Sequence, residues 1–268
     1  MIDKPDTRAL GRQRWRIRYA RDGTVADRTR RDEAVVWAEA IGSSGLPVVT
    51  TGQPPRPHLV FGPPLVVGAT AEDEPLDLVL FERLPIATVR SRLAPVRPPG
   101  YELRVLHDVW LGGRSLAAIG RAADYVIGVQ GSTRDVLEQA TSGLLAADRL
   151  ERTRRHGKEG ATFDLRPLVV DLAVVPDALL VRVRVDPERG VGRPDDVVAA
   201  LAEQLETSLE ISDLARVRVW LADDDPPASL ADVYRAYLDH RDPPAPADLS
   251  GAAQPPGPPA SAGRLELD

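Results

Sequence analysis

The chain has 268 residues, of which 43% are hydrophobic and 28% are charged, and it carries a formal net charge of −6. This length suits one large or two small domains, and the composition is ordinary for a soluble globular protein. The absence of cysteine excludes disulfides, thiolate zinc sites, cysteine nucleophiles and cysteine-ligated iron–sulfur clusters. No stretch approaches about 18 apolar residues and no signal-peptide pattern occurs, so we expect a cytoplasmic protein without a membrane segment.

The two ends of the chain differ in composition from its middle. Residues 1–11 are polar and show no periodicity, which predicts a flexible arm. Residues 223–268 hold nine acidic residues against three arginines, and nine prolines fall between Pro226 and Pro259. Such a segment buries too little apolar surface to offset its conformational entropy. We therefore expect an acidic linker with a short helix over 223–241 and a disordered, acidic, proline-rich tail over 242–268.

Between these ends, the apolar pattern changes repeatedly from the period of a strand to that of a helix. The first half is predicted to hold, in order, a strand at 12–19, a helix at 32–41 capped by Asp32, extended segments at 46–50 and 58–67, a strand at 76–82, a helix at 85–93 and a strand at 101–110. The second half is predicted to hold a strand at 124–130, a helix to about 146, an extended segment at 150–155, a hairpin at 168–175 and 179–185, a helix at 194–205 and a strand at 215–221.

Each half follows the order β-α-β-β-α-β, which is the order of the ferredoxin-like fold. We therefore predict an α+β protein with two ferredoxin-like halves in tandem, one at 12–121 and one at 122–222. In this arrangement two helices cover one face of a small antiparallel sheet, and the opposite face is left for another role.

The sequence contains none of the common catalytic or metal-binding motifs. The four histidines, at positions 58, 107, 156 and 240, are at least 49 residues apart. No paired-histidine zinc motif, nucleophile elbow or phosphate-binding loop occurs. We therefore assign no catalytic residue, no metal site and no cofactor to this chain.

Arginines that alternate with apolar residues on predicted strands are the strongest positive signal. Arg14, Arg16 and Arg18 lie on one strand, where alternate residues project from the same face about 6.6 Å apart. Residues 8–31 hold nine arginines against two aspartates, a local balance of +7. Sheet faces that carry basic and aromatic side chains bind RNA in several folds. Our candidate polyanion- or RNA-binding residues are Arg12, Arg14, Arg16, Arg18, Arg21, Arg182, Arg184, Arg216, Arg218 and Trp220.

The competing interpretation is structural. Arginine stems cover apolar surface and their guanidinium groups pair with carboxylates, so the same rows are expected on a solvated sheet face. The chain has only four Trp, five Tyr and three Phe residues, which leaves few rings to stack on bases. Trp220 is the main candidate for stacking because it shares a strand face with Arg218.

Two stretches resemble the radical SAM-linked protein family, whose members lie beside or are fused to radical SAM proteins and have no characterised function. Residues 16–23 (RIRYARDG) are similar to the family's opening strand and turn, and residues 45–68 (GLPVVTTGQPPRPHLVFGPPLVVG) are similar to its Gly-Leu-Pro and Phe-Gly-Pro-Pro-Leu-Pro-Val-Gly segments. The matching positions imply a structural motif of turns and packing: Gly45, Leu46, Pro47, Pro57, His58, Phe61, Gly62, Pro63, Pro64 and Gly68. The family's Ser-His-Leu-Asp and Asn-Pro-His-Pro segments have no counterpart here, which indicates a retained scaffold with a non-catalytic or divergent role.

We therefore expect a non-catalytic accessory or adaptor protein that binds RNA, or a separately encoded radical SAM protein, through an arginine-rich sheet face. The alternative is an RNA-processing endonuclease of the double-ferredoxin type, similar to CRISPR repeat-processing enzymes. Such enzymes usually carry a histidine near the first helix, and residues 21–45 contain none, which favours the binding role.

Overall fold

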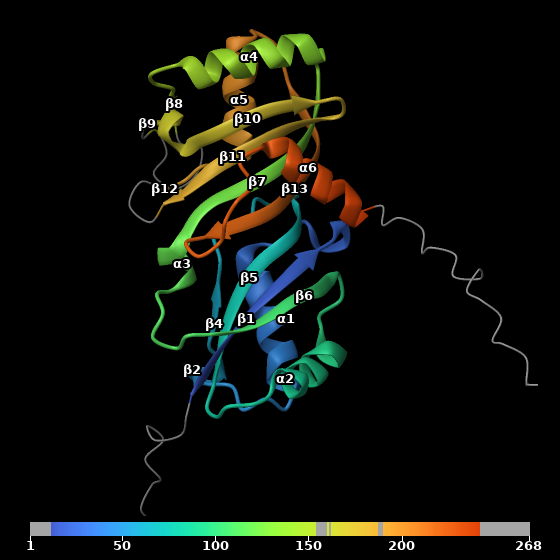
Figure 1. Cartoon of the computed structure of the whole chain (residues 1–268), viewed down its shortest axis with the longest axis vertical. Helices are drawn as coiled ribbons and strands as arrows, with labels where there is room; N and C mark the ends of the chain where they lie inside the picture. The colour runs from blue at the N-terminus through green and yellow to red at the C-terminus, as the bar shows by residue number, and fades with distance from the viewer. Residues whose placement is uncertain (1–11, 154–159, 161, 187–189, 242–268) are drawn as a thin grey trace, which may run out of the picture.

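A computed structural model describes residues 12–241 apart from 154–159, 161 and 187–189. The arm expected at 1–11 and the tail expected at 242–268 lie outside the described residues. The described chain is α+β, and its largest sheet has nine strands (Figure 1). No helix in this part of the chain is both long and apolar enough to cross a membrane.

The first half contributes four antiparallel strands to the large sheet, in the order β6-β1-β5-β4. Its elements, in chain order, are β1 (Gln13–Arg21), α1 (Arg30–Ser43), β2 (Thr50–Thr51), β3 (Arg56–Pro57), β4 (Leu59–Phe61), β5 (Thr70–Leu80), α2 (Ile86–Leu93), the 3-10 turn η2 (Ala94–Val96) and β6 (Tyr101–Val109). The short strands β2 and β3 pair with each other in a separate small sheet.

The second half repeats this connectivity, with antiparallel strands in the order β13-β7-β11-β10. Its elements are α3 (Leu116–Ile119), β7 (Gly120–Gln130), α4 (Arg134–Ala146), β8 (Glu151–Thr153), β9 (Thr162–Asp164), β10 (Val169–Val175), β11 (Ala178–Asp186), β12 (Gly190–Val191), α5 (Pro194–Gln204), β13 (Glu210–Leu221) and α6 (Leu230–Arg241).

A short parallel pairing joins the two sets of strands into one sheet. Ala215 and Arg216 of β13 pair with Thr70 and Ala71 of β5. The β5 strand uses its first residues for this contact and its later residues, 76–78, to pair with β4. The two halves are therefore connected by backbone hydrogen bonds as well as by side chains.

Each half has an apolar core between the sheet and two helices. In the first half, Trp15, Ile17 and Tyr19 of β1 pack against Trp37 of α1 and Leu93 of α2. In the second half, the core side chains come from β7 and β11 on one side and from α4 and α5 on the other, among them Tyr125, Ile127, Val181, Leu144 and Leu201. The alternation of apolar residues along each strand fixes which face meets the helices.

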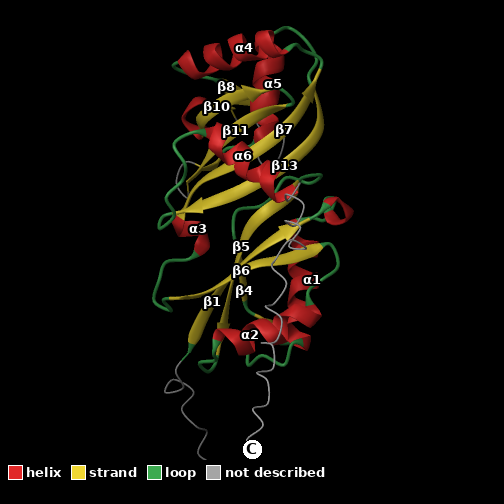
Figure 2. Cartoon of the chain, turned by 45° about the vertical axis from the view of Figure 1, so that its right-hand side comes forward, coloured by secondary structure: helices red, strands yellow, loops and turns green. Residues whose placement is uncertain are grey.

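The opposite face of the sheet is covered as well, contrary to our expectation. Figure 2 shows α6 crossing the sheet of the second half, where Leu230 and Tyr237 pack against Val126 and Leu180. In the first half, α3 contacts β4 and β5. In the segment 223–241, expected to be an acidic linker with a short helix, the helix is present as α6, and it packs on the sheet because it turns a stripe of apolar residues toward the strands.

Some element boundaries differ from the prediction for identifiable reasons. The first helix begins at Arg30 with Thr29 as its cap, so the predicted cap at Asp32 is wrong by three residues. Asp32 is the third helical residue, and its carboxylate accepts a hydrogen bond from the Thr29 backbone N–H. The strand expected at 76–82 begins at Thr70. Its early residues include Glu72, Asp73 and Glu74, and these three acidic residues hide the apolar pattern of a strand. They are accommodated in the sheet because each forms an ion pair with an arginine of another strand.

Candidate functional site along the edge strand β6

The arginines of β1 do not form an open row. Arg14, Arg16 and Arg18 are 8%, 8% and 4% exposed. Arg16 lies directly opposite Asp77 of β5, and its Nε donates to Asp77 Oδ1 at 2.8 Å. Arg14 Nε donates to Asp77 Oδ2 at 2.9 Å, and its Nη1 donates to the Gly113 carbonyl at 2.9 Å. One buried carboxylate thus holds two arginines beneath the loop that follows β6.

The third arginine of the row belongs to a group of charges between the halves. Arg18 donates to the Val219 carbonyl at 2.8 Å and to Asp224 at 2.9 Å. Asp73 lies 3.2 Å from Arg218 and 3.7 Å from Arg18. Burial raises the pKa of Asp73 above its ordinary value, although Arg18 and Arg218 act in the opposite direction.

Trp220 is also internal, so its ring is not presented for base stacking. It is 6% exposed, and its indole Nε1 donates to Asp124 Oδ2 at 2.6 Å. The same carboxylate accepts two hydrogen bonds from Arg182, at 2.7 and 2.8 Å. Arg218 lies over the Trp220 ring, 4.6 Å from its centroid. The expected arginine–tryptophan pair exists, but it packs between β13 and α6.

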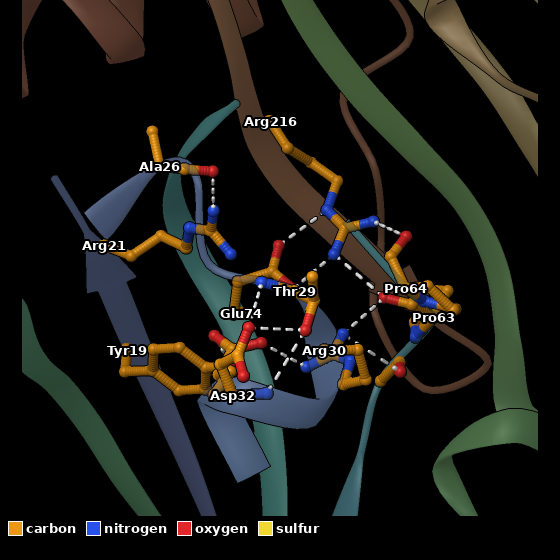
Figure 3. A network of polar contacts seen from close by, with 12 residues as sticks. Tyr19, Arg21, Ala26, Thr29, Arg30, Asp32, Pro63, Pro64, Glu74 and Arg216 are labelled. Atoms are coloured by element: carbon orange, nitrogen blue, oxygen red, sulfur yellow. Dashed lines mark hydrogen bonds and ion pairs between the residues drawn. The ribbon is translucent and has the colours of Figure 1, made fainter. Parts of the chain in front are cut away.

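Arg216 is the most deeply buried of the predicted arginines, at 0% exposure. Figure 3 shows its guanidinium group between Glu74 and the Pro63–Pro64 backbone. Its Nε donates to Glu74 Oε1 at 2.6 Å, and Nη2 and Nη1 donate to the carbonyls of Pro63 and Pro64 at 2.9 and 3.0 Å. Burial lowers the pKa of Arg216, but Glu74 and Tyr125 outweigh it and hold that pKa above the ordinary arginine value. Arg216 therefore remains charged and ties β13 to the first half.

The Phe61–Pro64 part of the family motif supplies backbone acceptors for this network. Arg30 of α1 donates to the Pro63 carbonyl at 2.8 Å and lies 4.9 Å from the centroid of the Phe61 ring. Gly62 is required by close approach, since a Cβ there would lie 2.8 Å from Pro75 Cγ. The motif thus binds two arginines from opposite halves through main-chain oxygens, which its prolines hold in place.

The rest of the motif forms turns and backbone hydrogen bonds. Gly45 and Gly68 have φ values of 69° and 89°, which favour glycine. His58 donates its backbone N–H to the Val49 carbonyl, and the Pro47 carbonyl accepts from Phe81, each at 2.8 Å. Leu46 is buried in the first core, and Pro57 pairs with Thr50. In the described structure these positions lie in turns, in backbone pairings and in the first core.

The remaining three predicted arginines have different surroundings. Arg12 is exposed at the start of the described chain. Arg21 is 3% exposed and donates to the Ala26 carbonyl at 2.5 Å (Figure 3). Arg184 is half-buried and donates to the Pro167 carbonyl at 3.0 Å. Most of the predicted arginines thus pair with carboxylates and carbonyls of the fold itself. This is the competing, structural interpretation of the arginine pattern.

A different surface, along β6, offers room and unused charge. Two hollows lie on either side of this strand, and both are lined by Arg104 and Val105. The helix-side hollow has a volume of about 290 Å³ and includes Leu93 and Leu106 in its lining. The junction hollow, toward β13 and α6, has a volume of about 350 Å³ and includes Val217 and Tyr237. We call these two hollows and the edge of β6 between them the β6 surface.

The strand between the hollows is an edge strand. Among the described residues, β6 pairs with β1 alone, so its other side carries no strand. A register shift between Arg18 and Tyr19 of β1 leaves Arg104 as an extra residue on β6, a bulge of the kind common at sheet edges. Val105 is 44% exposed beside it. Such an edge is a template for pairing with a further strand.

Two arginines without a side-chain partner in the described fold line the helix-side hollow. Arg90 and Arg97 are exposed and, within the described part of the chain, have neither an ion pair nor a hydrogen bond through their side chains. Residues 86–100 contain three arginines and no acidic residue. The sequence analysis did not single out Arg90 and Arg97, although the excess of positive charge in residues 86–100 is visible in the sequence. It favoured β1 and its neighbours, where arginines are more frequent.

A family model matches residues 14–194, from β1 to the first residue of α5; its description is "Uncharacterized protein conserved in bacteria (DUF2344)". This chain belongs to that family. The matched span includes Arg90, Arg97 and the whole of β6, whereas β13 and α6 lie outside it. The description names no radical SAM protein, so the radical SAM link remains a prediction. No curated protein matches the chain.

Solved structures resemble this DUF2344 family member at low identity. A chain of a Cbf5–Nop10–Gar1 complex is 12% identical with a TM-score of 0.46, over 85% of this chain and 56% of that one. A chain of an H/ACA RNP bound to a substrate RNA containing 2'-deoxyuridine is 15% identical with a TM-score of 0.43, over 85% and 55%. An unknown protein from Galdieria sulphuraria is 12% identical with a TM-score of 0.25, over 78% and 100%. The present chain thus spans a little over half of the first two.

Proposed function

We propose that this chain is a non-catalytic accessory protein, an adaptor that receives an extended segment of a partner protein at the β6 surface. The observation that carries the proposal is the exposed edge of β6 with a hollow on each of its faces. A segment added as a strand sends successive side chains to opposite faces of the sheet. Main-chain hydrogen bonds then give affinity, and the two hollows select the side chains.

The lining of the hollows indicates the chemistry of the segment. On the helix side the lining carboxylate, Glu102, is paired with Arg104, which leaves Arg90 and Arg97 to favour acidic side chains. Val217, Val233 and Tyr237 favour apolar side chains in the junction hollow, where Glu72 and Asp73 are already paired with Arg104 and Arg218. We therefore propose a partner segment in which acidic and apolar residues alternate.

We further propose that the scaffold consists of two ferredoxin-like units. The strand order in each half, β6-β1-β5-β4 and β13-β7-β11-β10, supports this interpretation, because it is the antiparallel arrangement that a β-α-β-β-α-β chain forms. The unit boundaries near residues 12–121 and 122–222 follow from it. The units share Arg216, Glu74 and the β5–β13 pairing, so they act as one platform.

The resemblance to the radical SAM-linked family suggests a separately encoded radical SAM protein as the partner. The present chain has no cysteine to ligate an iron–sulfur cluster, so in such a pair the partner would carry that cluster. A role in binding RNA draws less support, because Arg14, Arg16, Arg18, Arg182 and Arg216 already pair with internal carboxylates.

The adaptor role is tested by cross-linking in cells. A photo-reactive amino acid replaces Val105 on β6 or, as a control, Val170 on the opposite edge strand β10; the two positions are 44% and 43% exposed. We expect one protein to be cross-linked from position 105 and not from 170. The charge reversals Arg90→Glu and Arg97→Glu together should reduce that cross-link at least tenfold.

Mass spectrometry of the cross-linked protein then identifies the partner, and a radical SAM protein is the expected identity. Equal cross-linking from positions 105 and 170, or insensitivity to the charge reversals, would contradict the adaptor role. Cross-links to RNA would support the RNA-binding role instead. Discrete cleavage products, after incubation of the purified protein with total cellular RNA, would support the endonuclease alternative.

A further inference from the structure

The end of the packed chain lies next to the β6 surface. Tyr237 and His240, in the last turns of α6, line the same hollow as Arg104 and Val105 of β6. Figure 1 shows the end of α6 on the side of the molecule where β6 lies. The last residue of α6 is Arg241, so residues 242–268 are covalently attached to the fold next to this surface.

The sequence beyond α6 contains one segment with the chemistry that the β6 surface selects. Residues 264–268 read Arg-Leu-Glu-Leu-Asp, so Leu265 and Leu267 alternate with Glu266 and Asp268. This is the period of a strand with one apolar and one acidic face. Within 242–268, this alternation of leucine and acid occurs only here.

We propose that residues 264–268 bind the β6 surface of the same chain as an added strand, and so compete with the partner segment. Leu265 and Leu267 enter the junction hollow beside Val217 and Tyr237, and Glu266 and Asp268 face Arg90 and Arg97. This inference rests on the proposed function, because both occupants use the same edge.

The connecting chain has the reach that this contact needs. Residues 242–263 number 22, and a chain of that length spans about 25 Å when flexible and up to about 70 Å when extended as polyproline II. A tether of this kind supplies an effective concentration on the order of millimolar. A five-residue segment then occupies the edge without binding tightly, and a longer partner segment displaces it.

Amide hydrogen exchange of the full chain tests this contact. In the wild type, amides of residues 102–108 that face away from β1 should exchange about tenfold more slowly than in the Leu265→Ser, Leu267→Ser double variant. The control variant Leu249→Ser changes a leucine outside the alternating segment and should exchange like the wild type. Amides of β10, the other sheet edge, should be the same in all three proteins.

A labelled peptide of residues 261–268 separates this inference from the proposed function. It should bind the double variant at least tenfold more tightly than the wild type, because the tethered segment no longer competes, and Arg90→Glu with Arg97→Glu should weaken it. If the peptide binds both proteins equally and β6 exchange does not differ, the self-contact is wrong while the β6 surface stands. If the peptide binds neither protein and exchange does not differ, the self-contact is wrong and the strand-addition site loses its support as well.

Discussion

Arg216 of β13 and Glu74 of β5 form a fully buried ion pair across the seam between the halves. The two side chains are 0% and 2% exposed, and Arg216 also uses the carbonyls of Pro63 and Pro64. Removing water from two charges is costly, so such a pair stabilises the fold only while both partners and their further hydrogen bonds are in place.

Arg216→Met should therefore lower the free energy of unfolding by about 3–5 kcal/mol, because it leaves Glu74 charged and unpaired in the interior. Urea denaturation followed by circular dichroism measures the loss. The double variant Arg216→Met, Glu74→Met should recover part of it. The control is Arg235→Met, which breaks an exposed pair with Asp232 and should cost less than about 1 kcal/mol. If Arg216→Met and Arg235→Met lose the same unfolding free energy, the stabilising role of the buried pair is contradicted.

The arginines of β1 should behave as structural residues. Asp77→Asn removes the charge that both Arg14 and Arg16 contact, so we expect a loss of about 3–5 kcal/mol in unfolding free energy. Asp108→Asn is the control, because Asp108 on β6 pairs with the exposed Arg83. Urea midpoints decide between the two interpretations: an open arginine row would tolerate Asp77→Asn as easily as Asp108→Asn.

Gly62 should tolerate no side chain. A Cβ at Gly62 would lie 2.8 and 3.1 Å from ring atoms of Pro75, so Gly62→Ala should cost about 1–3 kcal/mol through overpacking. Gly23 is the matched control, since a Cβ there meets nothing within 4 Å. Thermal unfolding of the two alanine variants checks the difference, and a lower midpoint for Gly23→Ala than for Gly62→Ala would refute this explanation of the motif.

Helix α6 should contribute to stability as an integral element. Leu230 is 3% exposed against the second-half sheet, whereas Leu238 on the same helix is 42% exposed. Leu230→Ala should cost about 2–5 kcal/mol by leaving a cavity, and Leu238→Ala less than about 1 kcal/mol. Denaturant titrations of both variants are the measurement. Near-identical midpoints would mean that the short helix expected within 223–241 does not pack on the sheet.

The ionisation of Asp73 should appear in the pH dependence of stability. Burial raises its pKa in the folded protein, Arg18 and Arg218 oppose this, and Glu74 and Asp224 add to it. The folded state then holds the proton more tightly than the unfolded state, whose carboxyl pKa is about 3.9. The stabilising contribution is complete below about pH 4 and is lost as the pH rises through the folded-state pKa.

Compared with Asp73→Asn, which does not titrate, the wild type should therefore lose unfolding free energy as the pH rises from about 4. Denaturant titrations of both proteins at several pH values give this difference. Asp232→Asn, at an exposed position of α6, serves as the control. If instead the wild type gains unfolding free energy relative to Asp73→Asn as the pH rises from about 4, the ion pairs of Asp73 with Arg18 and Arg218 outweigh the effect of its burial.

The sequence by itself determined the order of the elements, because each helix and strand buries an apolar face whose period is local. The helices at Ile86–Leu93 and Pro194–Gln204 and the strand at Gln13–Arg21 lie within two residues of their predicted bounds. The turn role of Gly45 and Gly68 could also be predicted, since positive φ is a local property of glycine.

Only the tertiary structure decided what the arginines do. Alternation placed Arg14, Arg16 and Arg18 on one strand face, but it does not reveal what lies above that face. Their carboxylate partners are 55 or more residues away along the chain, and Asp77 faces Arg16 only because of the register between β1 and β5. The same reasoning holds for the β6 surface: its charges were visible in the sequence, but a free edge exists only once the strand order is set. Burial and strand neighbours depend on contacts between distant residues, and a local pattern carries no information about them.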